Sequence, residues 1–337
     1  MIAVTGGTGL VGSHLIIELV KRGESVRALK RESSSTKLLL DLADGNTDLL
    51  NNITWIDGDL LDIESVEELI QGCSHVFHCA ALISFLESEA LLMDKINIQG
   101  TENMVNCSLV SPDMKFFCYI SSVATLGREP GSKMLDENSH WIPGGHNSNY
   151  SISKYGAERE VWRGIAEGLP ASMVNPSIIL GKTNWKTGSG RLFEQVYKEM
   201  PFYTNGSSGF VDVLDVVDSM ILLMDKNIIG ERYIVNGGNI DYKYFFDRVA
   251  VLLNKRAPQL KVPKWVSSIV WRLEMIRGLI TNKAPFITKE SAYAAHQMRS
   301  YSSQKLLDLG FAFRNIEDTL SRTSKSFLRD IENIKTD

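Results

Sequence analysis

Short apolar runs alternate with helical patterns through the first half of this 337-residue chain. A run, a helix and a second run form the pattern of a βαβ unit, in which the two strands lie parallel in one sheet. Six runs have the length and apolar content of buried strands: residues 2–5, 25–29, 53–56, 76–79, 116–120 and 171–174. The chain is therefore predicted to be an α/β protein with a doubly wound parallel sheet.

The pattern becomes less regular after residue 175. A glycine-rich loop leads to a predicted helix over 193–199 and a predicted turn over 205–209. A helix over 213–224 and a strand over 232–235 then return to the sheet, and mostly helical pieces follow. We expect two parts: a sheet domain made of 1–175 and about 210–236, and a smaller, mostly helical C-terminal lobe made of about 176–209 and 237–337.

Charge and cysteine content restrict the class of function. The chain has 36 basic and 40 acidic side chains, a formal net charge of -4, whereas nucleic acids and anionic membranes attract basic proteins. Its four cysteines form no CxxC pair and have no histidine cluster beside them, so neither a disulfide framework nor a metal site is predicted. No apolar stretch reaches the length of a membrane span, and the N-terminus lacks a signal peptide's basic start and cleavage site, so we expect a cytoplasmic protein.

A glycine-rich turn, TGGTGLVG over residues 5–12, follows the first predicted strand and opens the first predicted helix. Glycines here permit a tight turn and let backbone N–H groups approach a pyrophosphate, which the helix N-terminus attracts. Two registers fit, GxGxxG starting at Gly7 or GxxGxxG starting at Gly6. Either predicts a dinucleotide site, with contacts from Gly6, Gly9, Leu10, Val11 and Gly12.

The end of the second strand bears on the choice of dinucleotide. Lys30 and Arg31 stand there, and a guanidinium can bind the extra phosphate of NADP bidentately. Glu32 stands about where an acid would bind the ribose hydroxyls of NAD. The sequence favours NADP over NAD, and solvated charges without a ligand remain the alternative.

Tyr150 and Lys154 lie one turn apart on a predicted helix, so both side chains occupy one face. A tyrosine with its ordinary pKa of about 10 needs a nearby cation to exchange protons at neutral pH. Ser121 and Ser122 stand where the fifth strand ends, the edge at which doubly wound sheets bind ligands. A hydroxyl there can hydrogen-bond a substrate oxygen.

The chain resembles the extended branch of the short-chain dehydrogenase/reductase superfamily, which includes nucleotide-sugar epimerases, dihydroflavonol reductases and 3β-hydroxysteroid dehydrogenases. Beyond the glycine turn and the YxxxK pair, four segments follow in the family's order: GDL at 58–60, HCAA at 78–81, NIQGT at 97–101 and NPS at 175–177. The resemblance covers residues 1 to about 330. It implies a Rossmann fold and a nicotinamide cofactor.

The resemblance also implies roles for individual residues. Tyr150 would be the general acid/base, Lys154 would lower its pKa and bind the nicotinamide ribose, and Ser122 would orient the substrate. Ser122 rather than Ser121 is chosen because it stands five residues before Gly127, as in the family's SSxxxxG segment. Further cofactor contacts are expected from Asp59, Leu60, Cys79, Ala80, Ala81, Asn175, Pro176 and Ser177, and no metal is needed.

The strongest hypothesis is an NAD(P)-dependent enzyme acting on a carbonyl or secondary alcohol. The first alternative is a nucleotide-sugar epimerase or dehydratase, but Ser208 and Gly209 replace the arginine that commonly grips a sugar diphosphate, and 123–125 (VAT) replace the Thr-Asp-Glu triplet of many dehydratases. The second alternative is a cofactor-sensing protein without turnover.

Two features leave partners and substrate open. The resemblance implies a homodimer paired through helices over 94–108 and 150–167. A predicted helix over 264–281 has an apolar stripe, which suits a helix packed on the lobe, a substrate cover or a membrane contact. The sequence assigns no substrate, reaction direction or stereochemistry.

Overall fold

The computed structural model describes residues 1–84, 86–127, 134–144, 147–281 and 288–336. Its centre is a seven-stranded sheet in the order β10-β6-β5-β4-β1-β2-β3, and every neighbouring pair is parallel. The strands are β1 (Ile2–Thr5), β2 (Val26–Lys30), β3 (Ile53–Asp57), β4 (His75–His78), β5 (Phe116–Ile120), β6 (Ala171–Pro176) and β10 (Arg232–Val235). The predicted doubly wound sheet is confirmed, including the late strand that returns to it.

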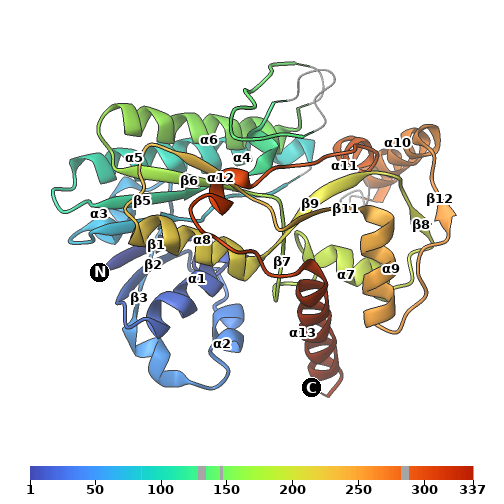
Figure 1. Ribbon diagram of the computed structural model, residues 1–337, viewed down its shortest axis with the longest axis horizontal. Helices are drawn as coiled ribbons and strands as arrows, with labels where there is room; N and C mark the ends of the chain where they lie inside the picture. Colours follow the sequence, from blue (N-terminus) through green and yellow to red (C-terminus); the bar gives the residue numbers. More distant parts are fainter. Residues whose placement is uncertain (85, 128–133, 145–146, 282–287, 337) are drawn as a thin grey trace.

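Helices cover both faces of this sheet (Figure 1). The first cluster of buried apolar side chains joins one face to α1 (Leu10–Lys21) and α8 (Val213–Asp225). The second cluster joins the other face to α3 (Ile63–Ile70), α5 (Gly100–Val110) and α6 (Asn149–Ala166). Because both faces are covered, both alternating sets of side chains are largely buried in the central strands β1, β4, β5 and β6, which explains why these strands read as mainly apolar runs.

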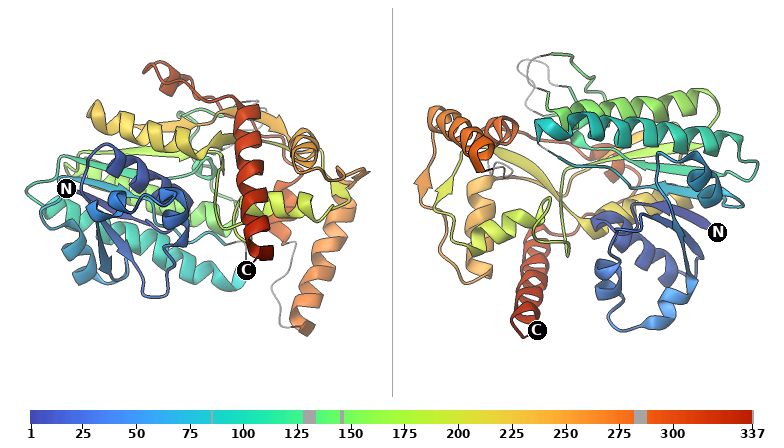
Figure 2. Two further views of the ribbon diagram at one scale, coloured as in Figure 1. Left: turned by 90° about the horizontal axis from the view of Figure 1, so that it is seen from below. Right: turned by 180° about the vertical axis from the view of Figure 1, so that it is seen from behind.

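A smaller sheet, in the order β11-β9-β7, lies beside the large one (Figures 1 and 2). It consists of β7 (Ile178–Leu180), β9 (Ser207–Asp212) and β11 (Gly238–Asp241). Its apolar cluster includes Phe193, Phe210, Phe245 and Phe327. These rings join the sheet to α7 (Gly190–Tyr197), α9 (Tyr242–Leu252) and α13 (Ile316–Thr336), and a further short pair links β8 (Phe202–Tyr203) to β12 (Leu260–Lys261).

One predicted turn is wrong in part. The structure places Ser207, Ser208 and Gly209 in the buried strand β9, although their composition is typical of a turn. A Cβ atom on Gly209 would lie 2.1 Å from the side-chain oxygen of Asn236. The small residues therefore serve close packing between the two sheets, which local composition does not distinguish from a turn.

The helix predicted over 264–281 forms α10 (Lys264–Thr281) at the periphery (Figure 2). It packs against α11 (Lys289–Ala294), and the Ser267 hydroxyl lies 2.7 Å from a ring nitrogen of His296 beyond α11. Its predicted apolar stripe is largely exposed, with Ile269 49% and Leu273 59% accessible. No helix among the described residues has the length and apolar character needed to cross a membrane.

Candidate active site

The glycine turn lies between β1 and α1. Gly6 has a φ of +68°, and a Cβ atom there would lie 2.7 Å from the backbone nitrogen of Ala80. A Cβ atom on Gly12 would lie 2.1 Å from the Gly6 carbonyl oxygen, and the Gly9 amide donates to that same oxygen at 2.9 Å. At Gly7 the nearest obstacle is only the end of the Ile16 side chain. The backbone therefore requires glycine at Gly6 and Gly12 but not at Gly7, which favours the register that starts at Gly6.

This turn fits a bound pyrophosphate. α1 starts at Leu10 and has no acidic residue in its first turn. Its N-cap residue is Gly9, which has no side chain to accept hydrogen bonds from the first amides of the helix. The first amides of a helix lack intrahelical partners and carry partial positive charge, so they favour an anion at this place. Gly6 and Gly12 keep the turn free of side chains.

A buried hydroxyl–imidazole chain holds the segment after β4 against this turn. The Thr5 hydroxyl lies 2.7 Å from His78 Nδ1 and accepts from the amides of Cys79 and Ala80 at 3.1 and 3.2 Å. His78 Nε2 lies 2.9 Å from the Thr101 hydroxyl. Burial lowers the pKa of His78 to about 3, so the ring is neutral and bridges two hydroxyls. This places Cys79 and Ala80 beside Gly6.

The predicted NIQGT element at 97–101 connects that segment to α6, the helix that contains Tyr150 and Lys154. The Asn97 amide oxygen accepts from the Leu82 amide at 2.7 Å. Its nitrogen donates to the Leu82 carbonyl at 3.0 Å and to the Ser153 hydroxyl of α6 at 2.9 Å. One buried amide thus fixes the distance between the segment after β4 and α6.

The structure brings Ser122 and Tyr150 together. Tyr150 lies in the first turn of α6, where the Ser148 hydroxyl accepts from the Ser151 amide at 3.1 Å and caps the helix. Ser122 follows β5 by two residues, and its hydroxyl accepts from the Ala124 amide at 3.1 Å. Burial raises the pKa of Tyr150, whereas its hydrogen bond with Ser122 lowers it. The predicted hydroxyl and phenol form one hydrogen-bonded pair.

The Lys154 ammonium is buried against β5, one helical turn after Tyr150. It donates to the Tyr119 phenol at 2.6 Å and to the Ile120 carbonyl at 2.7 Å, and the residue is 2% exposed. Burial lowers the pKa of Lys154 to about 7, and the charge of Glu158 opposes that shift. Burial raises the pKa of Tyr119 well above its ordinary value, so Tyr119 is a neutral phenol. The predicted field of Lys154 on Tyr150 stays a prediction, because the direct contacts of Lys154 are with β5.

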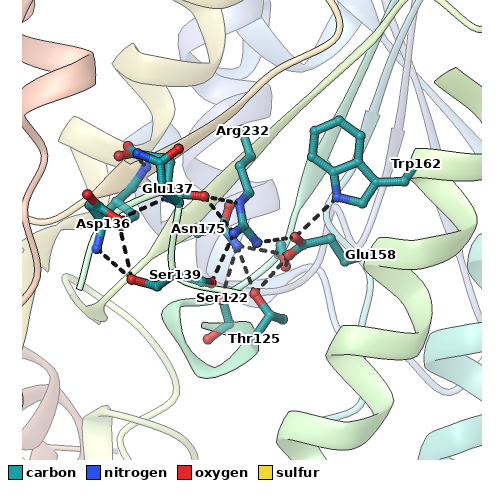
Figure 3. A network of polar contacts seen from close by, with 12 residues as sticks. Ser122, Thr125, Asp136, Glu137, Ser139, Glu158, Trp162, Asn175 and Arg232 are labelled. Atoms are coloured by element: carbon teal, nitrogen blue, oxygen red, sulfur yellow. Dashed lines mark hydrogen bonds and ion pairs between the residues drawn. The ribbon is translucent and has the colours of Figure 1, made fainter. Parts of the chain in front are cut away.

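Sequence reasoning missed a polar network around Glu158 (Figure 3). This carboxylate of α6 is paired with Arg232 of β10 and accepts from three side chains near Ser122, the predicted substrate-orienting serine. Those side chains are Ser121, Thr125 and Asn175. The signal was present in the sequence, because Tyr150, Lys154 and Glu158 repeat at intervals of four and therefore share one helical face.

The predicted dinucleotide-selecting cations differ in their contacts. Lys30 forms an ion pair with Asp57, the last residue of the neighbouring strand β3. Arg31 and Glu32 are both exposed just beyond β2. Lys30 is thus already engaged in the structure, and Arg31 is the more accessible cation for a phosphate.

The other predicted cofactor residues lie at the same edge of the sheet. Asp59 accepts from the Leu61 amide at 2.9 Å with one oxygen, and Leu60 is buried. Asn175 and Pro176 end β6, and Ser177 follows. The Asn175 amide donates to the Ser122 carbonyl at 3.1 Å, so it supports the serine loop directly.

Comparisons with known proteins agree with this geometry. The profile of the NAD dependent epimerase/dehydratase family matches residues 2–236. The chain is 28% identical to Sterol demethylase protein B of Methylococcus capsulatus, over 96% of this chain and 95% of that protein. It is 24% identical to Dihydroflavonol 4-reductase of Zea mays, over 93% and 84%. The crystal structure of gox2253 is similar with a TM-score of 0.80 and 29% identity, over 98% of both chains.

The chain belongs to the NAD dependent epimerase/dehydratase family. It is an NAD(P)-dependent oxidoreductase of the extended short-chain dehydrogenase/reductase type, as its fold and its relatives show.

Replacing Gly12 tests the close backbone packing of the glycine turn. Gly12→Ala should decrease the free energy of unfolding by about 1–3 kcal/mol and weaken NADPH binding, because the new Cβ atom overlaps the Gly6 carbonyl. Chemical denaturation and NADPH fluorescence titration measure both effects. Gly238→Ala is the matched control, since its Cβ atom would meet nothing closer than 3.9 Å. Unchanged binding by Gly12→Ala would contradict the predicted close approach.

Proposed function

We propose that this protein transfers a hydride between a nicotinamide cofactor and the carbonyl or secondary alcohol of a small molecule, with Tyr150 as the general acid/base. The observation that supports the proposal is the hydrogen bond between Ser122 and Tyr150. This pair lies at the same edge of the sheet as the glycine turn. The reductase name of the maize relative supports net reduction or oxidation of the substrate.

Each proposed catalytic side chain has one task. The Ser122 hydroxyl donates to the substrate oxygen and orients it toward the phenol. The Tyr150 phenol gives its proton to that oxygen during reduction and takes it back during oxidation. Lys154 contributes a buried positive charge below Tyr150 and binds the nicotinamide ribose hydroxyls. The bound nicotinamide supplies or accepts the hydride.

The proposed cofactor contacts follow the carboxyl edge of the sheet. The pyrophosphate binds the turn and the start of α1, and Asp59 accepts from the adenine amino group. The ring lies among small residues, beside the end of β6. The full proposed set is Gly6, Gly9, Leu10, Val11, Gly12, Lys30, Arg31, Asp59, Leu60, Cys79, Ala80, Ala81, Tyr150, Lys154, Asn175, Pro176 and Ser177.

We assign these contacts to one domain, residues 1–175 with about 210–236, and substrate binding to about 176–209 with 237–337. The separate apolar cluster of the smaller sheet supports this division. Hydrogen exchange with and without NADPH measures it, because protection confined to the second part would contradict the assignment.

Removing the phenol hydroxyl tests the proposed function. Tyr150→Phe should lower kcat by about 10²-fold or more and leave the NADPH dissociation constant nearly unchanged, because it removes only the proton donor. NADPH absorbance with a panel of ketones, aldehydes and alcohols measures turnover. Tyr155→Phe is the control, since that ring is on the same helix and stacks on Trp141.

Three outcomes would contradict the proposal. The first is a Tyr150→Phe enzyme with normal kcat. The second is turnover of a UDP- or dTDP-sugar without net change in NADPH, which indicates an epimerase. The third is NADPH binding with no turnover of any substrate in the panel, which indicates a cofactor sensor.

We propose NADP rather than NAD as the preferred cofactor, with Arg31 binding the additional phosphate. Arg31→Ala should weaken NADPH binding by about 10-fold or more, the scale of a lost charge-assisted hydrogen bond, and barely change NADH binding. Fluorescence titrations of both cofactors measure this. Glu32→Gln is the comparison, because an NAD enzyme would depend on that carboxylate. Equal weakening of NADH and NADPH by Arg31→Ala is the contradicting result.

We propose a homodimer paired through the helical face formed by α4 (Ala90–Asp94), α5 and α6 (Figure 1). Leu91 is 80% exposed on α4, and Ile152 is 45% exposed on α6, which packs against α4. Apolar side chains exposed this far suit an interface. Light scattering should give the mass of two chains, reduced to one by Leu91→Gln and unaffected by Val251→Gln on α9. A wild-type monomer would contradict the proposal.

A further inference from the structure

The carboxylate of Glu158 lies on the catalytic face of α6. Glu158 follows Lys154 by one turn and Tyr150 by two, so the three side chains form one row. Glu158 is 1% exposed. An ionised carboxylate at this depth is very unfavourable unless it is paired and fully hydrogen-bonded.

Both oxygens of Glu158 have partners (Figure 3). Oε1 accepts from Arg232 Nη1 at 2.8 Å and from the Trp162 indole at 3.4 Å. Oε2 accepts from the Ser121 hydroxyl, from the Thr125 hydroxyl at 2.8 Å and from the Asn175 amide at 2.9 Å. The carboxylate thus connects α6, β6, β10 and both ends of the segment from Ser121 to Thr125.

That segment contains the proposed substrate-orienting serine. The Ser122 carbonyl accepts from the Thr125 hydroxyl at 2.9 Å and from the Asn175 amide at 3.1 Å. Both of these donors also bind Glu158. The position of Ser122 therefore depends on one carboxylate through two short chains of hydrogen bonds.

Arg232 extends the network to the loop that contains Glu137 and Ser139. Its guanidinium donates to the Glu137 carbonyl at 3.1 and 2.6 Å and to the Ser139 carbonyl at 3.2 Å. The Glu137 carboxylate accepts from the Ile234 amide of β10 at 2.8 Å. A Cβ atom on Gly127 would lie 1.6 Å from the His140 carbonyl oxygen, so this loop packs directly on the end of the serine segment.

The charge of Glu158 also acts on Lys154. Its negative charge favours the ammonium form, against the effect of burial. The other ionisable groups that surround Lys154 are phenols, a thiol and a neutral imidazole: Tyr119 of β5, Tyr150 of α6, and His78 and Cys79 at the end of β4. Among these groups, Glu158 is the carboxylate whose negative charge stabilises the protonated form of Lys154.

We propose that Glu158 is a positioning residue of the catalytic centre, which holds Ser122 in place beside Tyr150 and maintains a negative charge one helical turn from Lys154. The inference rests on the proposed function, because it gives Glu158 its role through Ser122, Tyr150 and Lys154. Glu158 itself does not touch substrate or cofactor.

Glu158→Gln tests the role in the full-length enzyme. The amide cannot accept from all five donors and carries no charge, so kcat should fall about 10-fold while NADPH binding stays close to wild type. The high-pH decline of kcat should also move to lower pH. We expect wild-type kcat to fall as pH rises through the pKa of Lys154, and without the Glu158 charge Lys154 should lose its proton at lower pH. A purely structural defect would lower kcat equally at every pH.

A pH titration by NMR provides a readout that needs no substrate. The Cε resonance of Lys154 in ¹³C-lysine-labelled protein, assigned with Lys154→Met, should titrate at lower pH in Glu158→Gln than in the wild type. Glu160→Gln is the matched control, because Glu160 lies on the same helix and its partner is Arg163. An unchanged Lys154 midpoint in Glu158→Gln would overturn the inference.

Two further variants separate the parts of the role. Glu158→Asp keeps the charge but shortens the reach, so it should lower kcat and leave the pH of the decline near wild type. Glu158→Gln with Arg232→Met removes both charges of the buried pair and should regain stability without regaining kcat or the wild-type pH profile. Full recovery of kcat in this double variant would show that Glu158 acts only on stability.

Failure of the inference is distinguishable from failure of the proposed function. If Tyr150→Phe loses activity and Glu158→Gln keeps the wild-type kcat and pH profile, only the inference is wrong. If Tyr150→Phe keeps its activity, the proposed function is wrong, and the NMR titration still measures the effect of Glu158 on Lys154.

Discussion

The parallel pairing of β1, β4, β5 and β6 is the constraint on which the rest of the structure depends. Parallel strands end at the same edge of a sheet, so the segments that follow them meet there although they lie far apart in the chain. The glycine turn, the Cys79–Ala80 segment, the Ser122 segment and the end of β6 are those segments. α6 packs on one face of the sheet, and its N-terminal part adds Tyr150 and Lys154 beside the Ser122 segment.

The buried charged side chains of Lys154 and Glu158 require hydrogen-bond partners from the surrounding elements. A buried ammonium and a buried carboxylate are each unstable without hydrogen-bond partners. Lys154 donates to the Tyr119 phenol and the Ile120 carbonyl, whereas Glu158 accepts from five donors. The hydrogen bonds that satisfy the Glu158 carboxylate also hold the segment that contains Ser122. In the proposed function, the same contacts would therefore serve both stability and catalysis.

Local patterns predicted most of the sheet because most of its strands contain a short, mainly apolar run that is followed by a helix or a turn with its own signal. The glycine register, left open by the sequence, is decided at Gly6, whose positive φ and close approach to the Ala80 backbone require glycine, because Gly9 and Gly12 belong to both registers. β9 was predicted partly as a turn because Ser207, Ser208 and Gly209 have the composition of a turn, whereas Gly209 is required by its close approach to Asn236 and Ser177. The cytoplasmic location stays a prediction.

By itself the sequence determined the doubly wound fold, the dinucleotide turn and the residues Ser122, Tyr150 and Lys154 as candidates, since these depend on short-range spacing and on the order of motifs. Only the tertiary structure decided that Lys30 is engaged by Asp57 and that Lys154 binds Tyr119. It also decided that Glu158 joins four elements through Arg232, Asn175 and the serine segment. Such contacts join residues up to 74 positions apart, so no local pattern contains them.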